Sequence, residues 1–170
     1  MTAPAPDHHA LRLFLALWPE ADTRHRLQHV QAQQNWPQGA RPTPAPDLHL
    51  TLHFLGQVPE HRLGDLLQTL PQPTKSIELT LDTLELWPNH IAALTPSSAP
   101  EALLALHAKL AETIDSLGLR RETRPYRPHV TLARKAQGWQ PVSCEPLIWQ
   151  ASGYVLALSD RGYHVLQHLG

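Results

Sequence analysis

Hydrophobic and polar positions alternate along much of this chain with a period of two, the spacing of a half-buried strand. This alternation predicts strands at residues 11–18, around His49, at 77–86 and 91–94, around His129, and at 154–158 and 163–166. Prolines suited to a first helical turn open predicted helices over residues 19–34 and 59–70. Leucines at helical spacing predict a third helix over residues 101–117, capped by Gly118. The proline-rich residues 36–46 are expected to form a loop.

Two of the predicted strands carry the same four-residue pattern. The copies are His49-Leu50-Thr51-Leu52 and His129-Val130-Thr131-Leu132. Side chains two apart on a strand point the same way, so each copy places an imidazole and a hydroxyl on one polar face and two apolar residues toward a core. The copies lie 80 residues apart, close to half of the 170-residue chain, which indicates an internal duplication of one β–α unit.

Two such strands facing each other would supply an acid and a base, because an imidazole with a pKa near ~6.5 exists in both protonation states around neutral pH. The alternative interpretation is two ordinary half-buried strands with polar outer faces. The first interpretation is preferred because both copies also follow proline-containing loops.

Composition limits the class of protein. The length predicts a single domain over residues 10–170, preceded by a disordered tail at residues 1–9 that is rich in proline, alanine and histidine. No run of ~18 apolar residues predicts a membrane span, and the N-terminus lacks the build of a signal peptide. Cys144 is the only cysteine, which precludes an internal disulfide and favours the cytoplasm. A net charge of −1 argues against an extended nucleic-acid track.

The charge is nevertheless uneven. Residues 120–135 contain six basic side chains against the single acid Glu122: Arg120, Arg121, Arg124, Arg127, Arg134 and Lys135. This local basic patch could hold a few phosphates, or it could be a solvated loop. The sequence leaves both interpretations open.

Four blocks of sequence, in order, resemble a known family. They are Arg12-Leu13-Phe14-Leu15-Ala16-Leu17, His49 to Gly56, Arg127 to Arg134, and Ser159 followed by Tyr163-His164-Val165-Leu166. The chain resembles the RNA 2′,3′-cyclic phosphodiesterases of the 2H phosphoesterase superfamily, also called 2′-5′ RNA ligases. The resemblance implies an α+β fold of two lobes related by a pseudo-twofold, with mostly antiparallel sheets, helices outside and a central cleft.

The resemblance also implies a reaction, the opening of a 2′,3′-cyclic phosphate to a 2′-phosphomonoester. By resemblance, His129 is the proton acceptor and His49 the proton donor. The symmetry of the two motifs alone leaves these roles open, and they would swap in the reverse, ligating direction. Thr51 and Thr131 are expected to donate hydrogen bonds to phosphoryl oxygens, and Arg134 to add a charged contact. Neither a metal nor a cofactor is expected.

Other polar and aromatic residues have weaker assignments. His53 departs from the family pattern, which bears on substrate preference, and strict alternation places it on the face of His49 at the rim of the cleft. Tyr126 is expected to stack on an RNA base, with a core or hinge aromatic as an equal alternative. His25 and His29 are one helical turn apart, but a solvated helix face is preferred to a metal site.

Several functions remain open at this point. The leading hypothesis is a metal-independent phosphodiesterase acting on RNA ends, as a monomer without membrane partners. The alternatives are a related enzyme for small cyclic nucleotides, ADP-ribose cyclic phosphate or 2′-5′ linkages, an RNA-binding module without turnover, and a histidine-rich metalloenzyme. The paired titratable residues argue against pure binding, because binding alone would not require them.

Overall fold

The computed structural model describes residues 9–170 of the chain. Its helices are α1 (Ala21–Ala32), α2 (Leu63–Thr69) and α3 (Glu101–Ser116), with short 3-10 turns at Ala45–Asp47 and Glu60–Arg62. Its strands are β1 (Ala10–Leu17), β2 (Arg41–Pro42), β3 (Leu50–Pro59), β4 (Ile77–Leu81), β5 (Thr83–Leu86), β6 (Ala92–Thr95), β7 (Val130–Arg134), β8 (Leu147–Ala151), β9 (Tyr154–Ser159) and β10 (Tyr163–Leu169). The tail predicted to be disordered lies outside the described residues except for His9, whose carbonyl accepts a hydrogen bond from the amide of Glu60 at 2.9 Å.

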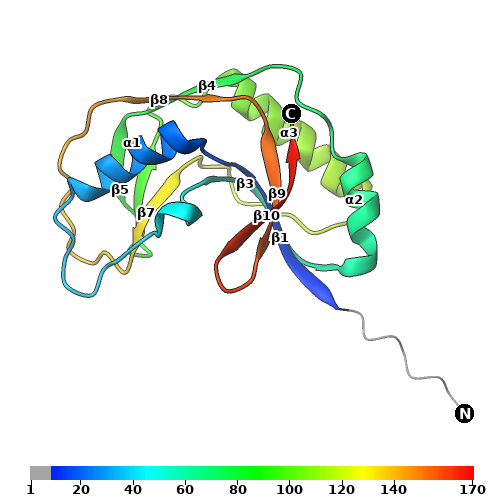
Figure 1. The fold of residues 1–170 in the computed structure, drawn as a ribbon, viewed down its shortest axis with the longest axis horizontal. Coiled ribbons are helices and arrows are strands. Elements are labelled where there is room, and N and C mark those ends of the chain that lie inside the picture. The colour runs from blue at the N-terminus through cyan, green and yellow to red at the C-terminus, as the bar shows by residue number, and fades with distance from the viewer. Residues whose placement is uncertain (1–8) are drawn as a thin grey trace, which may run out of the picture.

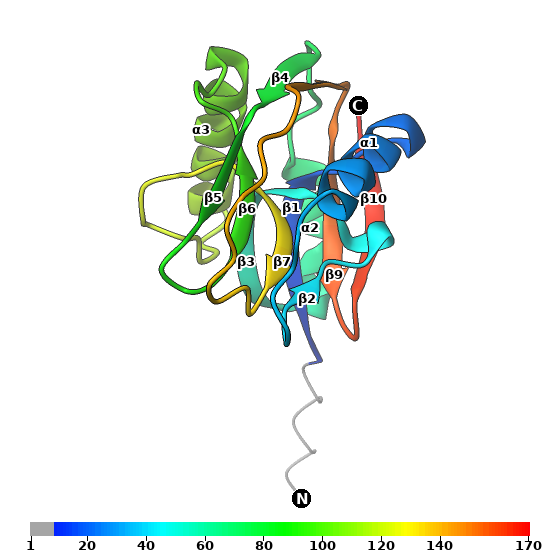
Figure 2. The ribbon, with the colours of Figure 1, turned by 90° about the vertical axis from the view of Figure 1, so that its left-hand side faces the viewer.

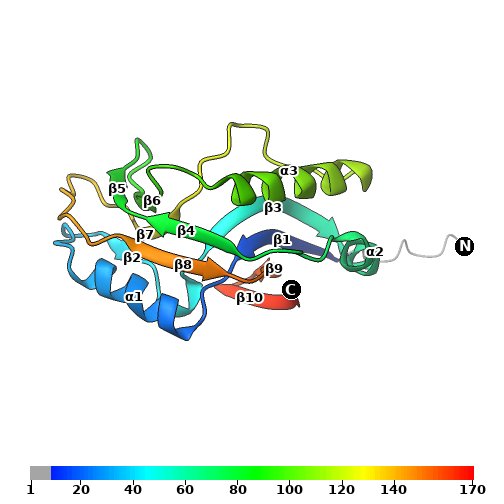
Figure 3. The ribbon, with the colours of Figure 1, turned by 90° about the horizontal axis from the view of Figure 1, so that it is seen from above.

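One antiparallel sheet of eight strands forms the centre of the molecule (Figure 1). Its strand order is β10-β9-β1-β3-β7-β6-β5, and the short β2 pairs with the end of β7 beyond the single residue pair between β7 and β3. A separate ribbon of β4 and β8 lies between α1 and α3 when the molecule is seen from above (Figure 3). This arrangement confirms the predicted α+β class with mostly antiparallel strands. No helix within residues 9–170 has the length and apolar character needed to cross a membrane.

The predicted duplication is visible in the strand pairing. The order strand, helix, antiparallel strand occurs as β1-α1-β3 and again as β6-α3-β7. The registers match, because Ala16 lies opposite Thr51 in the first unit and Ala93 lies opposite Thr131 in the second. The two units meet at one residue pair between β3 and β7, so the two histidine motifs begin side by side at the middle of the sheet.

Each histidine strand contains a β-bulge at the same place. In β3, Thr51 lies opposite Ala16 while His53 lies opposite Leu15, so Leu52 is an extra residue. An extra residue reverses the faces of the residues that follow it. His53 therefore points to the opposite face from Thr51, and its predicted position on the face of His49 is wrong.

The bulge in β7 follows the same rule. Thr131 lies opposite Ala93 and Ala133 lies opposite Ala92, so Leu132 is the extra residue. The fifth residue after each histidine consequently shares a face with the threonine of its motif: Phe54 in β3 and Arg134 in β7.

The apolar side chains of the sheet separate into two layers because they alternate along β1. Leu13, Leu15 and Leu17 belong to the main core under the helices and the β4–β8 ribbon. Phe14 and Ala16 belong to a smaller cluster on the other face, where the histidine motifs lie. Fully burying a leucine or phenylalanine contributes about 1.5–3 kcal/mol, so both layers hold β1 at the centre of the sheet.

Four elements differ from the predictions. The helix predicted over residues 59–70 becomes α-helical only at Leu63, because Pro59 belongs to β3 and Glu60–Arg62 form a 3-10 turn. The strand predicted over residues 77–86 is divided between the two sheets, because the carboxylate of Asp82 accepts hydrogen bonds from the amide and hydroxyl of Ser97, both at 2.7 Å. The strand β8 was not predicted, and β2 lies within the predicted loop. The third helix ends as predicted, with Gly118 at a φ of 66°.

Candidate active site

A pocket of about 330 Å³ lies beside the junction of β3 and β7. It is lined by the segment before β3, by β7 and by the hairpin of β9 and β10, and its lining residues are Arg41, Pro42, Thr43, Pro44, Asp47, His49, Thr131, Arg134, Ser159, Gly162 and Tyr163. Figure 2 shows the turn of this hairpin at the same end of the molecule as β2 and β7. Three distant parts of the sequence therefore form one site.

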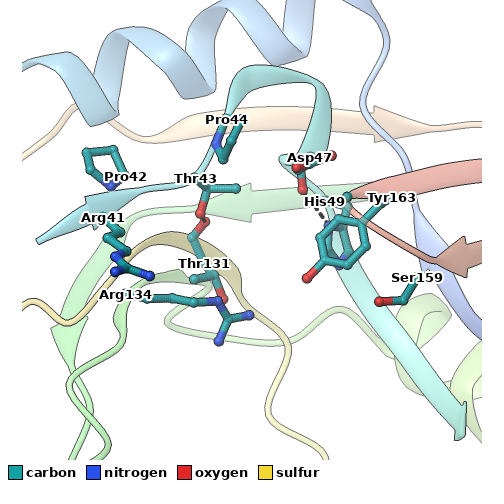
Figure 4. Close-up of a pocket in the computed structure, with 11 residues that line it drawn as sticks. Arg41, Pro42, Thr43, Pro44, Asp47, His49, Thr131, Arg134, Ser159 and Tyr163 are labelled. Atoms are coloured by element: carbon teal, nitrogen blue, oxygen red, sulfur yellow. Dashed lines mark hydrogen bonds between the residues drawn. The ribbon is translucent and has the colours of Figure 1, made fainter. Parts of the chain in front are cut away.

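His49 occupies one side of the pocket (Figure 4). Its Nδ1 lies 2.6 Å from the carbonyl oxygen of Asp47, to which it donates, and its Nε2 lies 3.0 Å from Oγ1 of Thr51. The Trp18 ring stacks on the imidazole at 5.1 Å and 10°, and the Tyr163 ring meets it edge-on at 5.0 Å. The hydrogen bond from Nδ1 leaves Nε2 of neutral His49 as an acceptor, which the Thr51 hydroxyl occupies.

His129 has the same backbone support. Its Nδ1 lies 2.9 Å from the carbonyl oxygen of Arg127, again the residue two positions earlier. The Trp87 ring packs on the imidazole at 4.3 Å, and the Arg127 guanidinium lies 4.4 Å from the centre of the same indole. Both histidines are thus oriented through Nδ1, which directs Nε2 away from the backbone contact.

The surroundings lower the pKa of both histidines below the ordinary value of 6.5. Burial is the main cause in each case. At His49 the nearby charges of His129 and Arg134 lower the pKa further, while the Asp47 carbonyl and carboxylate raise it. At His129 the positive charges of Arg127 and Arg134 lower the pKa, and only the backbone hydrogen bond raises it. The two imidazoles therefore share a geometry but differ in their electrostatics.

Two arginines lie at the other side of the pocket from His49 (Figure 4). Arg41 of β2 and Arg134 of β7 are directly opposite each other in the antiparallel pair. Both are exposed, and within residues 9–170 neither forms a salt bridge. Unpaired guanidinium groups beside Thr131 are suited to holding phosphoryl oxygens.

Three of the four other arginines of the basic segment are engaged elsewhere. They pair with carboxylates: Arg121 with Asp115 at 2.8 Å, Arg124 with Glu122 at 2.8 Å, and Arg127 with Glu85 at 3.4 Å. These pairs favour the solvated-loop interpretation for most of the segment. Of its basic residues, the pocket includes only Arg134.

The residues that line the pocket do not include His129, Thr51, His53 or Tyr126. His53 is buried, and its Nε2 lies 2.8 Å from the carbonyl oxygen of His107, so it does not lie at the rim as predicted. The Tyr126 hydroxyl donates to the carbonyl oxygen of Thr51 at 2.9 Å, and its ring stacks on His107. These contacts are those of the hinge aromatic considered above, and base stacking by Tyr126 stays a prediction.

The pocket includes residues that the sequence analysis did not single out. Arg41 and Thr43 lie in the predicted loop, where the alternation of proline with polar residues is a signal for an extended edge segment. Asp47 precedes His49 by two residues, the spacing that the carbonyl contact requires. His25 and His29 are exposed on α1, as expected for a solvated face, and within residues 9–170 no group of three or more side chains could hold a metal ion.

Comparison with known sequences finds relatives that carry the same name. The RNA 2′,3′-cyclic phosphodiesterase of Escherichia coli is 35% identical over 129 residues, which cover 74% of this chain and 72% of the relative. The protein of the same name from Thermus thermophilus is 29% identical over 164 residues, covering 88% of this chain and 82% of the relative.

Comparison with solved structures gives the same answer. The apo form of E. coli LigT superimposes with a TM-score of 0.81 at 29% identity, over 94% of this chain and 96% of that one. E. coli LigT complexed with 3′-AMP superimposes with a TM-score of 0.79 at 29% identity, over 94% and 97% of the two chains. The sequence model described as the 2′-5′ RNA ligase superfamily matches residues 18–159. By this match and by its similarity to the E. coli protein, the chain belongs to the 2′-5′ RNA ligase superfamily.

Proposed function

We propose that this protein is an enzyme that hydrolyses 2′,3′-cyclic phosphate ends of RNA to 2′-phosphomonoesters. The observation that carries the proposal is the pair of histidines, each oriented by a hydrogen bond from Nδ1 to the carbonyl two residues earlier, at the junction of two duplicated units. The names of the relatives and the 3′-AMP complex of a structural neighbour support a nucleotide substrate of this kind.

The chemistry follows from the side chains present. Nε2 of His129 takes a proton from water as the water oxygen forms a bond to phosphorus. The bond from phosphorus to the 3′ oxygen breaks, and Nε2 of His49 gives that oxygen a proton. Thr51, Thr131 and Arg134 hold the phosphoryl oxygens while charge shifts toward the leaving oxygen. The two histidines supply both proton transfers, so the proposed mechanism is independent of a metal ion or cofactor.

The charges around His49 act on its protonation in both directions. The Asp47 carboxylate favours the protonated form of His49, whereas the charges of His129 and Arg134 disfavour it. Arg127 and Arg134 face His129 and favour its neutral form. A bound phosphate anion adds negative charge beside His49 and raises its pKa toward the protonated state that a donor requires.

We further propose that Arg41 joins Arg134 in binding the phosphate groups of the RNA end, because the two lie opposite each other with free guanidinium groups. Ligation in the reverse direction, with the histidine roles exchanged, belongs to the same proposal. The proposal also includes a monomer in which residues 10–170 act as one bilobal domain. It includes a cytoplasmic location, which the single cysteine supports.

The test is an assay on a short RNA ending in a 2′,3′-cyclic phosphate, with the product identified as the 2′- or 3′-monoester. The wild type should give the 2′-monoester at the same rate with and without EDTA. His49→Ala and His129→Ala should each lower the rate by ~10²–10⁴-fold without loss of folding. His25→Ala, which removes an exposed histidine of α1, is the matched control. A rate abolished by EDTA, or a near-normal rate in either variant, would contradict the proposal.

A further inference from the structure

Three rings from three elements form one stack on the side of β3 away from the pocket. They are His53 of β3, His107 of α3 and Tyr126 of the loop before β7. The His53 and His107 rings are 4.0 Å apart at 19°, and the His107 and Tyr126 rings are 3.8 Å apart at 14°. The hydrogen bond from His53 to the His107 carbonyl fixes the first ring against α3. The stack therefore ties the helix, the strand and the loop together.

Tyr126 connects this stack to the candidate site. Its hydroxyl donates to the Thr51 carbonyl at 2.9 Å, at the point where the bulge interrupts the pairing of β3 with β1. The Thr51 side chain in turn lies 3.0 Å from Nε2 of His49. A path of two hydrogen bonds thus runs from the tyrosine through the threonine to the histidine.

The same tyrosine lies close in sequence to the second motif. Tyr126 precedes His129 by three residues, and Pro125 and Pro128 flank it on the two sides. Proline restricts its own backbone and that of the preceding residue, so this short segment has little freedom. One side chain consequently links the segment that leads into the second motif to the threonine of the first.

The stack is local to the first motif. Ala133 follows His129 by four residues, as His53 follows His49, but it packs in a small apolar cluster and bears no ring. The duplicated scaffold alone therefore does not require a histidine at this position.

Burial is the main reason why the two histidine rings of the stack are neutral at pH 7. Burial, followed by the charges of His53 and Arg121, lowers the pKa of His107 to about 4. Burial and Arg121 lower the pKa of His53, against the opposing effects of the His107 carbonyl and Asp115. Asp115 and Arg121 are themselves paired at 2.8 Å. The stack is thus free of internal charge repulsion at neutral pH.

We propose that Tyr126 is a positioning residue that holds the Thr51 hydroxyl in place, and that His107 and His53 hold Tyr126. The inference rests on the proposed function, because Thr51 acts on the phosphate only there. Removing the Tyr126 hydroxyl should lower kcat and leave KM unchanged, because it displaces the Thr51 hydroxyl, whose hydrogen bond to the phosphate is strongest in the transition state. It should also raise the pKa of His49, because a hydroxyl that donates to neutral Nε2 stabilises the neutral form.

Tyr126→Phe tests this, since it keeps the ring and removes only the hydroxyl. Tyr154→Phe is the matched control, because that buried hydroxyl donates to the Pro71 carbonyl away from the pocket. The measurements are kcat and KM on the cyclic-phosphate RNA, and the pKa of His49 by NMR. In Tyr126→Phe, kcat should fall roughly ten-fold and KM change less than about two-fold, with the pKa of His49 raised. Tyr154→Phe should match the wild type.

Two further variants test the stack itself. His107→Phe keeps a flat ring and should preserve kcat, whereas His107→Ala should lower kcat as Tyr126→Phe does. A raised KM at unchanged kcat in Tyr126→Phe would mean that the tyrosine contacts RNA directly and would overturn the proposal. Unchanged kinetics with an unchanged pKa of His49 would also overturn it. If the wild type does not cleave the RNA, the proposed function fails, and the pKa of His49 in Tyr126→Phe still decides whether Tyr126 positions Thr51.

Discussion

At the residue scale, two histidines with the same backbone support have different neighbours. Both donate from Nδ1 to a carbonyl two residues earlier, a contact that the strand geometry repeats. The charges of Asp47, His129 and Arg134 act on His49, which also contacts the rings of Trp18 and Tyr163, whereas Arg127 and Arg134 act on His129. The two proposed catalytic histidines therefore share one motif and differ in their surroundings.

The lowered pKa values of the two histidines predict that activity is greatest at acidic pH. One histidine must be neutral and the other protonated, so kcat/KM should follow a bell. Because burial lowers the pKa of both below 6.5 in the free enzyme, the maximum should lie below pH 6.5. The kcat profile should peak at higher pH, since the bound phosphate raises both pKa values. Initial rates measured from about pH 4 to about pH 9, a range that spans the titration of histidine, give both pH profiles. A rate that rises steadily through pH 8 would contradict it.

The two threonines should affect chemistry more than binding. Thr51→Val and Thr131→Val keep the β-branched shape and remove the hydroxyl that is proposed to bind the phosphoryl group. Each should lower kcat by roughly 10²-fold with little change in KM. Thr80→Val, the same change in β4 away from the pocket, is the control. Unchanged kcat in both variants would show that these hydroxyls only support the strands.

At the element scale, the alternation along each strand predicted which residues face the site up to the threonine. It failed at the next residues, because a bulge depends on the pairing with a neighbouring strand and not on the strand's own sequence. His53 was placed on the wrong face for this reason. The interruption at Asp82 has a similar origin, since the hydrogen bonds from Ser97 that divide β4 from β5 come from 15 residues away.

The histidine stack should make the stability of the fold depend on pH. The pKa of His107 is about 4 in the folded protein against 6.5 ordinarily, so the unfolded chain binds more protons between these values. The free energy of unfolding should therefore fall as the pH falls from 6.5 toward 4. The free energy of unfolding, measured with urea at about pH 7 and about pH 5, should decrease less for His107→Phe than for the wild type. Equal losses in the two proteins would argue against a neutral His107 in the stack.

At the scale of the whole molecule, a duplicated scaffold brings two copies of one motif to the centre of a single sheet. The sequence predicted this duplication from the spacing of the motifs and predicted the chemistry from their residues. It did not predict the rest of the pocket, because Arg41 and Tyr163 reach the site only through pairing of β2 with β7 and folding of the β9–β10 hairpin. Contacts between distant segments of this kind have no local signal.

The most direct test of the two-histidine mechanism replaces the 3′ bridging oxygen of the cyclic phosphate with sulfur. A thiolate leaves without receiving a proton, so the donor becomes unnecessary while the acceptor is still required. His49→Ala should therefore cleave the sulfur substrate at near the wild-type rate, and His129→Ala should stay slower by ~10²-fold or more. Rescue of His129→Ala instead would reverse the two roles. Failure to rescue either variant would contradict proton donation by His49.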